Sequence, residues 1–182
     1  INDKLKESII ICIAHLISID VSLLKADKCD EKWITSAWNT QEWSDLSKIY
    51  YEKLIKKFKH ENLFYICLSF AKKPFADLRL ASHLYMKALA QTKWGLEFLF
   101  APNKYNSSTE FIEQFLLNRS LEIEKQGLES KYELNRLLVA NFELNENLHH
   151  FIGEFNFIKL KQYVSEGPFY SQSVSRVAFE SN

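Results

Sequence analysis

The sequence has 182 residues, 47% of them hydrophobic and 14% aromatic, which is enough for one folded domain with a sizeable core. Lysine and arginine together number 23, as do aspartate and glutamate, so the basic excess that is usual in nucleic-acid-binding domains is missing. Four glycines and three prolines are too few for the turns of an all-β protein, and no apolar run approaches the length of a membrane span.

Apolar residues at helical spacing predict two helices in the first third of the chain, over about residues 3–24 and 40–58. Thr40 is the predicted N-cap of the second helix. The charged residues 26–31 are expected to form a loop, whereas the segment that holds Trp33 and Trp38 fits either a short helix or a bridging loop. The chain begins at Ile1, which predicts a fragment of a longer protein. The three cysteines form no CxxC pair, and each is expected to be a small buried side chain in a reducing compartment: Cys12, Cys29 and Cys67.

The middle of the chain, residues 74–100, predicts a central helix followed by a shorter one that starts at Trp94. Pro74 suits a helix entrance, where the missing N–H costs nothing. The predicted buried stripe consists of apolar residues at helical spacing: Leu78, Ala81, Tyr85 and Ala88. The opposite face carries polar residues four apart, and we expect it to face away from the core: Arg79, His83, Lys87 and Gln91.

Helices are predicted over residues 61–71, 107–116, 127–142, 145–153 and 156–166, with Asn156 as the cap of the last one. Gly167 and Pro168 end that helix, and residues 169–182 have no helical stripe. We therefore expect an all-α chain with a helical-repeat domain of the ARM/HEAT type over residues 1–168 and an extended C-terminal tail over 169–182. A compact irregular helical domain is the alternative architecture, because no internal repeat is visible.

No catalytic motif is found: the sequence lacks GxSxG, a glycine-rich phosphate loop and HExxH. Arg79 and His83 resemble the Arg and His of helical RNases of the HEPN class, but three residues separate them instead of four to six. His149 and His150 are adjacent, diverge by about 100° on a helix and are expected to be a surface pair rather than metal ligands. No cofactor or metal site is predicted.

The polar stripe Arg79, His83 and Lys87 has two interpretations. It is either a solvated face or a contact surface for a partner, as on the concave side of a HEAT-type array. A negatively charged partner would relieve the mild repulsion between like charges one turn apart. Trp33, Trp38 and Trp43 likewise either seal a core edge or form a binding platform.

Near the C-terminus, residues 161–170 read Lys-Gln-Tyr-Val-Ser-Glu-Gly-Pro-Phe-Tyr, and this segment resembles the closing signature of the proteasome non-ATPase regulatory subunit 5 family. Further matches occur in the same order: Pro74-Phe75 with Asp77-Leu78, Trp94 with Phe100, Asn118-Arg119-Ser120-x-Glu122, and Lys131-Tyr132-Glu133-Leu134. The resemblance covers about residues 61–182. Val164 and Phe169 depart from the family's Leu and Tyr.

The resemblance implies an ARM/HEAT-like repeat protein of the cytoplasm and nucleus that is not an enzyme. It implies an assembly chaperone for the base of the 26S proteasome regulatory particle, which binds the C-terminal domain of a base ATPase subunit and leaves before the particle is complete. Such a chain is expected to be a monomer when unbound, with no nucleic acid or membrane partner. A generic helical scaffold, or a stable subunit of another complex, is the alternative.

The candidate partner-binding residues are the central stripe and the closing signature: Arg79, His83, Lys87, Tyr163, Glu166 and Tyr170. The signature also has a purely structural interpretation, in which Gly167 and Pro168 end a helix and the two tyrosines close the last core layer.

Overall fold

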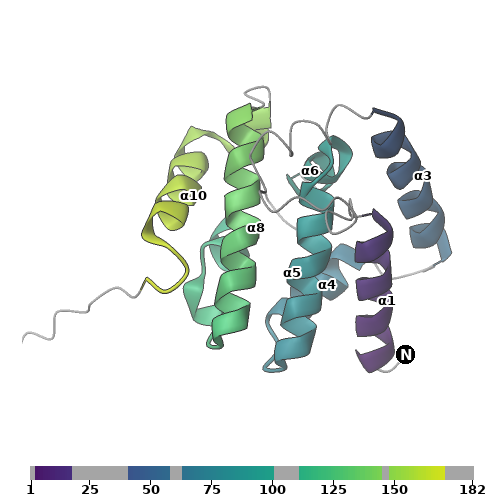
Figure 1. Cartoon of the computed structure of the whole chain (residues 1–182), viewed down its shortest axis with the longest axis horizontal. Helices are drawn as coiled ribbons and strands as arrows, with labels where there is room; N and C mark the ends of the chain where they lie inside the picture. The colour runs from purple at the N-terminus through teal and green to yellow at the C-terminus, as the bar shows by residue number, and fades with distance from the viewer. Residues whose placement is uncertain (1–2, 18–40, 58–62, 101–110, 145–147, 171–182) are drawn as a thin grey trace, which may run out of the picture.

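A computed structural model describes residues 3–17, 41–57, 63–100, 111–144 and 148–170, which form helices and no strand, as predicted. The longer helices follow one another along the long axis of the molecule, in the spatial order α3, α1, α5, α8 and α10 (Figure 1). The elements are α1 (Asp3–Ile17), α3 (Gln41–Lys57), α4 (Leu63–Ala71), α5 (Ala76–Ala90), α6 (Lys93–Phe100), η2 (Ile112–Leu116), η3 (Arg119–Leu121), α8 (Lys125–Leu144), α9 (His149–Ile152) and α10 (Glu154–Glu166).

Helix α5 is the centre of the fold, because it packs against α1, α4, α6 and α8. Its predicted apolar stripe is confirmed, since Leu78, Ala81, Tyr85 and Ala88 are all buried. Because α5 has neighbours on more than one side, burial extends well beyond that stripe.

Short turns join α5 to the helices on either side of it, as predicted. After α4, the backbone N–H of Lys72 donates to the Ser69 carbonyl. After α5, the Thr92 hydroxyl accepts from the N–H of Gly95 at 3.1 Å and so caps α6. A Cβ at Gly95 would lie 2.0 Å from the Leu89 carbonyl oxygen, so this tight connection requires glycine.

Two predicted elements differ from the structure in the C-terminal half. The helix expected over 107–116 is, within the described residues, the π-helical turn η2. Asn156 is not the cap of the last helix, because Gly153, with φ 74°, ends α9 and begins α10. Asn156 lies inside α10 and donates to the Ile152 carbonyl at 2.8 Å. The predicted end is confirmed, since α10 stops at Gly167 with φ 82°.

The succession of packed helices is consistent with a helical-repeat solenoid, while the ARM/HEAT type and the division at residue 168 stay predictions. Cys67 is buried as expected, but the expectation is wrong for Cys12, which is exposed. No described helix is both long enough and apolar enough to span a membrane. Other predictions concern residues outside the described ranges: Cys29, Trp33, Trp38, Thr40, the helix start at 107–110 and the tail from residue 171.

Candidate functional site

The polar side of α5 is not an exposed surface. Arg79 is 5% exposed and His83 is fully buried, so the expectation that they face away from the core is wrong. The reason lies in the tertiary structure: α8 and the segment formed by η3 and Glu122 (the η3 segment) lie against this side of α5. Lys87 is the partly exposed member of the stripe, and its Nζ lies 3.0 Å from Glu133 on α8.

Glu122, which follows η3, is the buried partner of Arg79. Its Oε2 accepts from Arg79 Nε at 3.0 Å, and the two side chains are 1% and 6% exposed. Arg79 also donates from Nη1 to the Lys73 carbonyl at 3.0 Å. The pair thus ties α5 to the η3 segment, where a charge without a partner would be strongly destabilising.

His83 is a neutral imidazole in this cluster. Its Nε2 lies 3.3 Å from Glu122 Oε1, in a geometry that makes no hydrogen bond. Burial lowers the pKa of His83 to about 3, and the nearby charges of Lys131, Lys87 and Arg79 act in the same direction. Because Arg79 and His83 are both covered, neither can contact an RNA strand as the RNase interpretation requires.

Lys131, in the Lys-Tyr-Glu-Leu motif of α8, is a fully buried lysine. Its ammonium donates to the carbonyl of Asn118 and lies 5.3 Å from the centre of the Phe115 ring. Burial lowers the pKa of Lys131 to about 7, although the carboxylate of Glu122 acts in the opposite direction. Lys131 thereby holds Asn118 in place. Asn118 in turn caps η3, because its Oδ1 accepts from the Ser120 N–H.

Arg119, the first residue of η3, holds the C-terminal end of α10. Nη1 donates to the Gly167 carbonyl at 2.8 Å, and Nη2 donates to the Tyr163 carbonyl at 3.0 Å and to Glu166 Oε2 at 3.1 Å. The guanidinium carbon lies 3.8 Å from the centre of the Tyr163 ring and 5.4 Å from that of Tyr170. One arginine therefore satisfies the last carbonyl groups of a helix that is distant in sequence.

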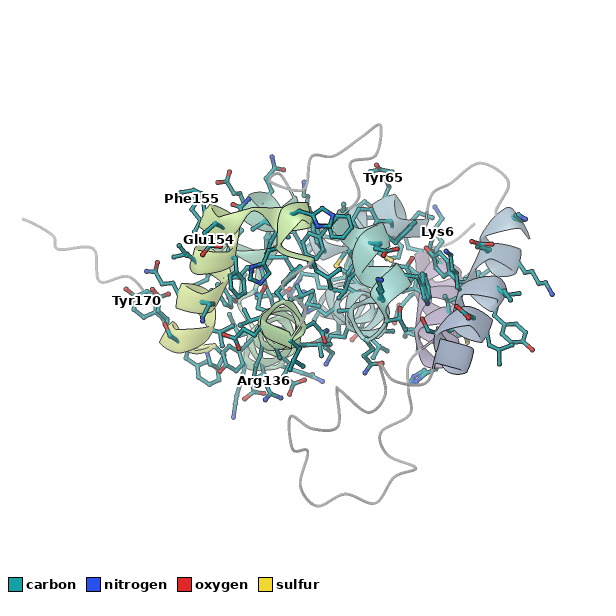
Figure 2. The ribbon with its side chains drawn as sticks, turned by 90° about the horizontal axis from the view of Figure 1, so that it is seen from above. Lys6, Tyr65, Arg136, Glu154, Phe155 and Tyr170 are labelled. Carbon is teal, nitrogen blue, oxygen red and sulfur yellow. The ribbon has the colours of Figure 1, made fainter. Side chains whose placement is uncertain are left out.

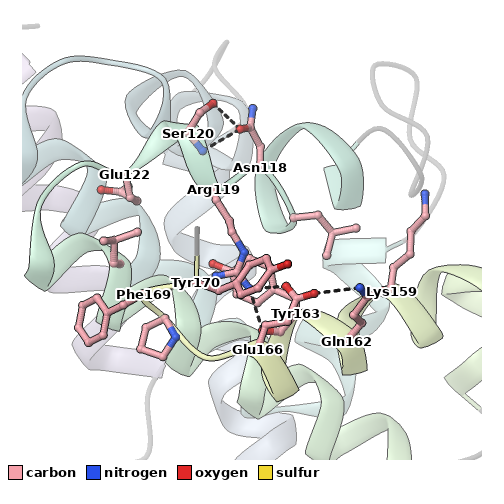
Figure 3. A pocket seen from close by; sticks show the side chains of 13 residues that line it. Asn118, Arg119, Ser120, Glu122, Lys159, Gln162, Tyr163, Glu166, Phe169 and Tyr170 are labelled. Carbon is pink, nitrogen blue, oxygen red and sulfur yellow. Dashed lines mark hydrogen bonds and ion pairs between the residues drawn. The ribbon is translucent and has the colours of Figure 1, made fainter. Parts of the chain in front are cut away.

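An open pocket of about 670 Å³ lies between the η3 segment and the end of α10 (Figure 3). Leu117, Arg119 and Leu128 line it on one side, and Lys159, Gln162, Tyr163 and Glu166 line it on the other. The rest of the lining consists of Asn118, Ser120 and Glu122 beside Arg119, and of Pro168, Phe169 and Tyr170 after α10.

The structure brings together three of the six predicted site residues at this pocket: Tyr163, Glu166 and Tyr170. Tyr170 is 43% exposed and lies at the α10 edge of the molecule (Figure 2), whereas Tyr163 is buried and forms a wall. Arg119, which links them, was missed as a site residue. The sequence feature that could have indicated Arg119 is its position in the Asn118–Glu122 motif.

No metal centre is found in the described ranges, where no three His, Cys, Asp or Glu side chains gather. His149 Nε2 lies 2.8 Å from the Phe142 carbonyl, and its ring centre is 4.5 Å from that of Phe157. His150 is exposed. The two histidines therefore point to different surroundings, as adjacent helix residues do.

Comparison with known proteins gives one consistent result. Residues 34–182 match the model of a family described as "Proteasome non-ATPase 26S subunit". Over 110 residues the chain is 32% identical to the Homo sapiens protein named 26S proteasome non-ATPase regulatory subunit 5, and 31% identical to the Bos taurus protein of that name. The aligned residues are 60% of this chain but 20% of each relative, so they span about a fifth of its length. No solved structure matches the chain.

Proposed function

Because this chain belongs to the proteasome non-ATPase 26S subunit family, we propose that it is a non-catalytic assembly chaperone of the 26S proteasome regulatory particle. The observation that carries the proposal is the family match over residues 34–182. The curated relatives are named as regulatory subunits of the proteasome, which supports a proteasome-related role without catalysis.

The proposed partner is the C-terminal domain of one of the base ATPase subunits. The chain would bind it as a monomer in the cytoplasm or nucleus and leave before the complete particle forms. The pocket beside α10 supports a binding role, because exposed aromatic side chains adjoin a pocket that faces solvent: Phe169 is 57% and Tyr170 43% exposed.

Arg79 and His83 are left out of the proposed contact surface, because both are buried under the η3 segment. Lys87 remains partly exposed on another part of α5, but its ion pair with Glu133 already satisfies its charge. Tyr163 and Glu166 are proposed to form the supporting wall, and Tyr170 the contact itself.

A pull-down tests the partner. The purified chain is immobilised, its folding is verified by circular dichroism, and separately expressed C-terminal domains of the six base ATPases are offered one at a time. We expect capture of one or two of the six. Capture of none by the folded chain, and also none by a full-length relative, would overturn the ATPase partner.

Sedimentation separates the chaperone from the alternative of a stable subunit. After gradient fractionation of cell extract, a chaperone is found with base assembly intermediates and is absent from finished 26S particles. If the chain occurs in stoichiometric amounts in finished particles, or in an unrelated complex, the chaperone role is wrong.

A further inference from the structure

The charged side chains that line the pocket beside α10 already have partners inside the chain. Arg119 pairs with Glu166 at 3.1 Å, Lys159 pairs with Glu113 at 3.0 Å, and the lining residue Glu122 pairs with Arg79. A charged ligand that broke the pair of Arg119 with Glu166, or that of Arg79 with Glu122, would leave a buried or partly buried charge alone, which is costly. The electrostatics of the pocket therefore favour an uncharged occupant.

The uncharged polar residues of the lining also have partners inside the chain, since the Ser120 hydroxyl donates to Asn118 and the Gln162 amide donates to Glu166. The rest of the lining is apolar or aromatic and partly exposed. Leu128, near the start of α8, is half-buried, lines the pocket and stands outside the contiguous core. Phe169 and Tyr170 continue this lining and are 57% and 43% exposed. Covering these groups removes apolar surface from water, which is the main favourable term in protein association.

The wall that carries these aromatic rings is fixed before any partner arrives. Arg119 binds the carbonyls of Tyr163 and Gly167, and Gln162 Nε2 donates to Glu166 Oε1 at 2.8 Å (Figure 3). A preformed wall lowers the conformational entropy that binding would otherwise cost.

We propose that this pocket is the docking site for an uncharged apolar side chain, aromatic or aliphatic, of the protein partner. The inference rests on the proposed function, because the partner is the ATPase domain named there. Leu128 and Tyr170 make the contact, and Arg119 acts only as a positioning residue for Tyr170.

The first experiment measures the affinity of Leu128→Gln and Tyr170→Ser for the captured ATPase domain. Leu144→Gln is the matched control for the first change, because Leu144 is 49% exposed and lies roughly 24 Å further along α8. Tyr50→Ser is the control for the second, because Tyr50 is 59% exposed on α3, at the opposite end of the molecule. We expect each pocket variant to weaken binding about tenfold, with thermal stability unchanged, and each control to change it less than twofold.

The second experiment tests the pocket without the ATPase. N-acetyl-phenylalaninamide and N-acetyl-glutamate amide are titrated separately into the 15N-labelled chain, and amide chemical shifts are followed. We expect the phenylalanine probe to shift residues 117–119, 128 and 169–170, with loss of these shifts in Leu128→Gln, and the glutamate probe to shift none of them.

These two experiments distinguish failure of the inference from failure of the proposed function. Binding of the ATPase with unchanged affinity in both pocket variants would overturn the docking site and leave the function standing. Shifts with the phenylalanine probe, together with no ATPase capture by the folded chain or by a full-length relative, would support the pocket and overturn the partner. Absence of probe shifts would overturn the proposal. A dimer that Leu128→Gln dissociates would also overturn it, because the occupant of the pocket would then be another copy of this chain.

Discussion

Glu122 is the buried acidic residue that Arg79 and His83 share as a neighbour. Its carboxylate faces Arg79 and His83 from α5 and lies close to Gly127 at the start of α8. Removing one partner of a buried ion pair typically costs about 3–5 kcal/mol, because the other charge is left without compensation. The close approach of Glu122 to α8 and the neutrality of His83 each lead to a prediction.

Gly127→Ala is expected to destabilise the protein by about 2 kcal/mol, although alanine is normally the better helix former by about 1 kcal/mol. The reason is steric: a Cβ at position 127 would lie 2.1 Å from Glu122 Oε2, and that carboxylate is held by Arg79. Urea unfolding measures the change. In a Glu122→Ala background the same substitution should be neutral or stabilising, and additive effects in the double-mutant cycle would contradict the explanation.

His83 should make the protein less stable as pH falls. Its pKa is about 3 when folded against 6.5 for the free side chain, so below pH 6.5 the unfolded chain binds more protons and stability drops. From pH 6.5 to 4.5 the loss should be about 2 kcal/mol larger in the wild type than in His83→Leu. Urea unfolding across this pH range tests it. His150→Asn, at an exposed position, should keep the wild-type slope.

At the scale of elements, α10 depends on a side chain from outside the helix. Gly167 ends it with φ 82°, and Arg119 from η3 binds the carbonyls of Tyr163 and Gly167 together with the carboxylate of Glu166. Charge-assisted hydrogen bonds of this kind are stronger than neutral ones, and the planar fork of arginine lets one group make several. The last turn of α10 and the segment that carries Tyr170 are therefore stabilised together.

Arg119→Lys is expected to lower the free energy of unfolding by about 2 kcal/mol, because one ammonium group cannot reach all three acceptors. Amide hydrogen exchange at residues 163–167 should accelerate in the variant. The matched control is Arg136→Lys, at an exposed position on the surface of α8 (Figure 2), which should stay within about 0.5 kcal/mol of the wild type. Equal effects of the two substitutions would mean that the positive charge alone matters.

At the scale of the whole molecule, stability is expected to decrease from α5 toward α3. Helix α5 is enclosed by α1, α4, α6 and α8, whereas α3 lies at one end of the array (Figure 1). The described contacts of α3 are few and include two polar ones: the Tyr51 hydroxyl lies 2.5 Å from that of Tyr85, and Ser47 accepts from the Trp94 indole at 3.0 Å. Leu46, Ile49 and Tyr50 on α3 are exposed.

Native-state hydrogen exchange should therefore show the slowest amides in α5 and much faster exchange in α3, by local opening. Tyr51→Phe removes the buried hydroxyl contact and should accelerate α3 further without changing α5. If α3 exchanges as slowly as α5, the end of the array is as stable as its centre and this ranking is wrong.

The sequence by itself determined the helical class, the central position of α5 and the stop at Gly167. These features depend on local physics: apolar spacing decides which residues form a helix face, and only glycine adopts positive φ at little cost. The resemblance of residues 118–122 and 161–170 to a known family also indicated Tyr163, Glu166 and Tyr170, whose partner roles stay predictions.

Only the tertiary structure decided which polar residues are buried. The pairs that matter join residues far apart in the chain, 43 positions for Arg79 with Glu122 and 47 for Arg119 with Glu166. Helical periodicity shows that Arg79 and His83 lie opposite the apolar stripe, but it does not show that α8 and the η3 segment cover that side. A face without apolar residues becomes interior when a neighbouring segment supplies the counter-charge, as Glu122 does for Arg79, and that depends on packing rather than on local sequence.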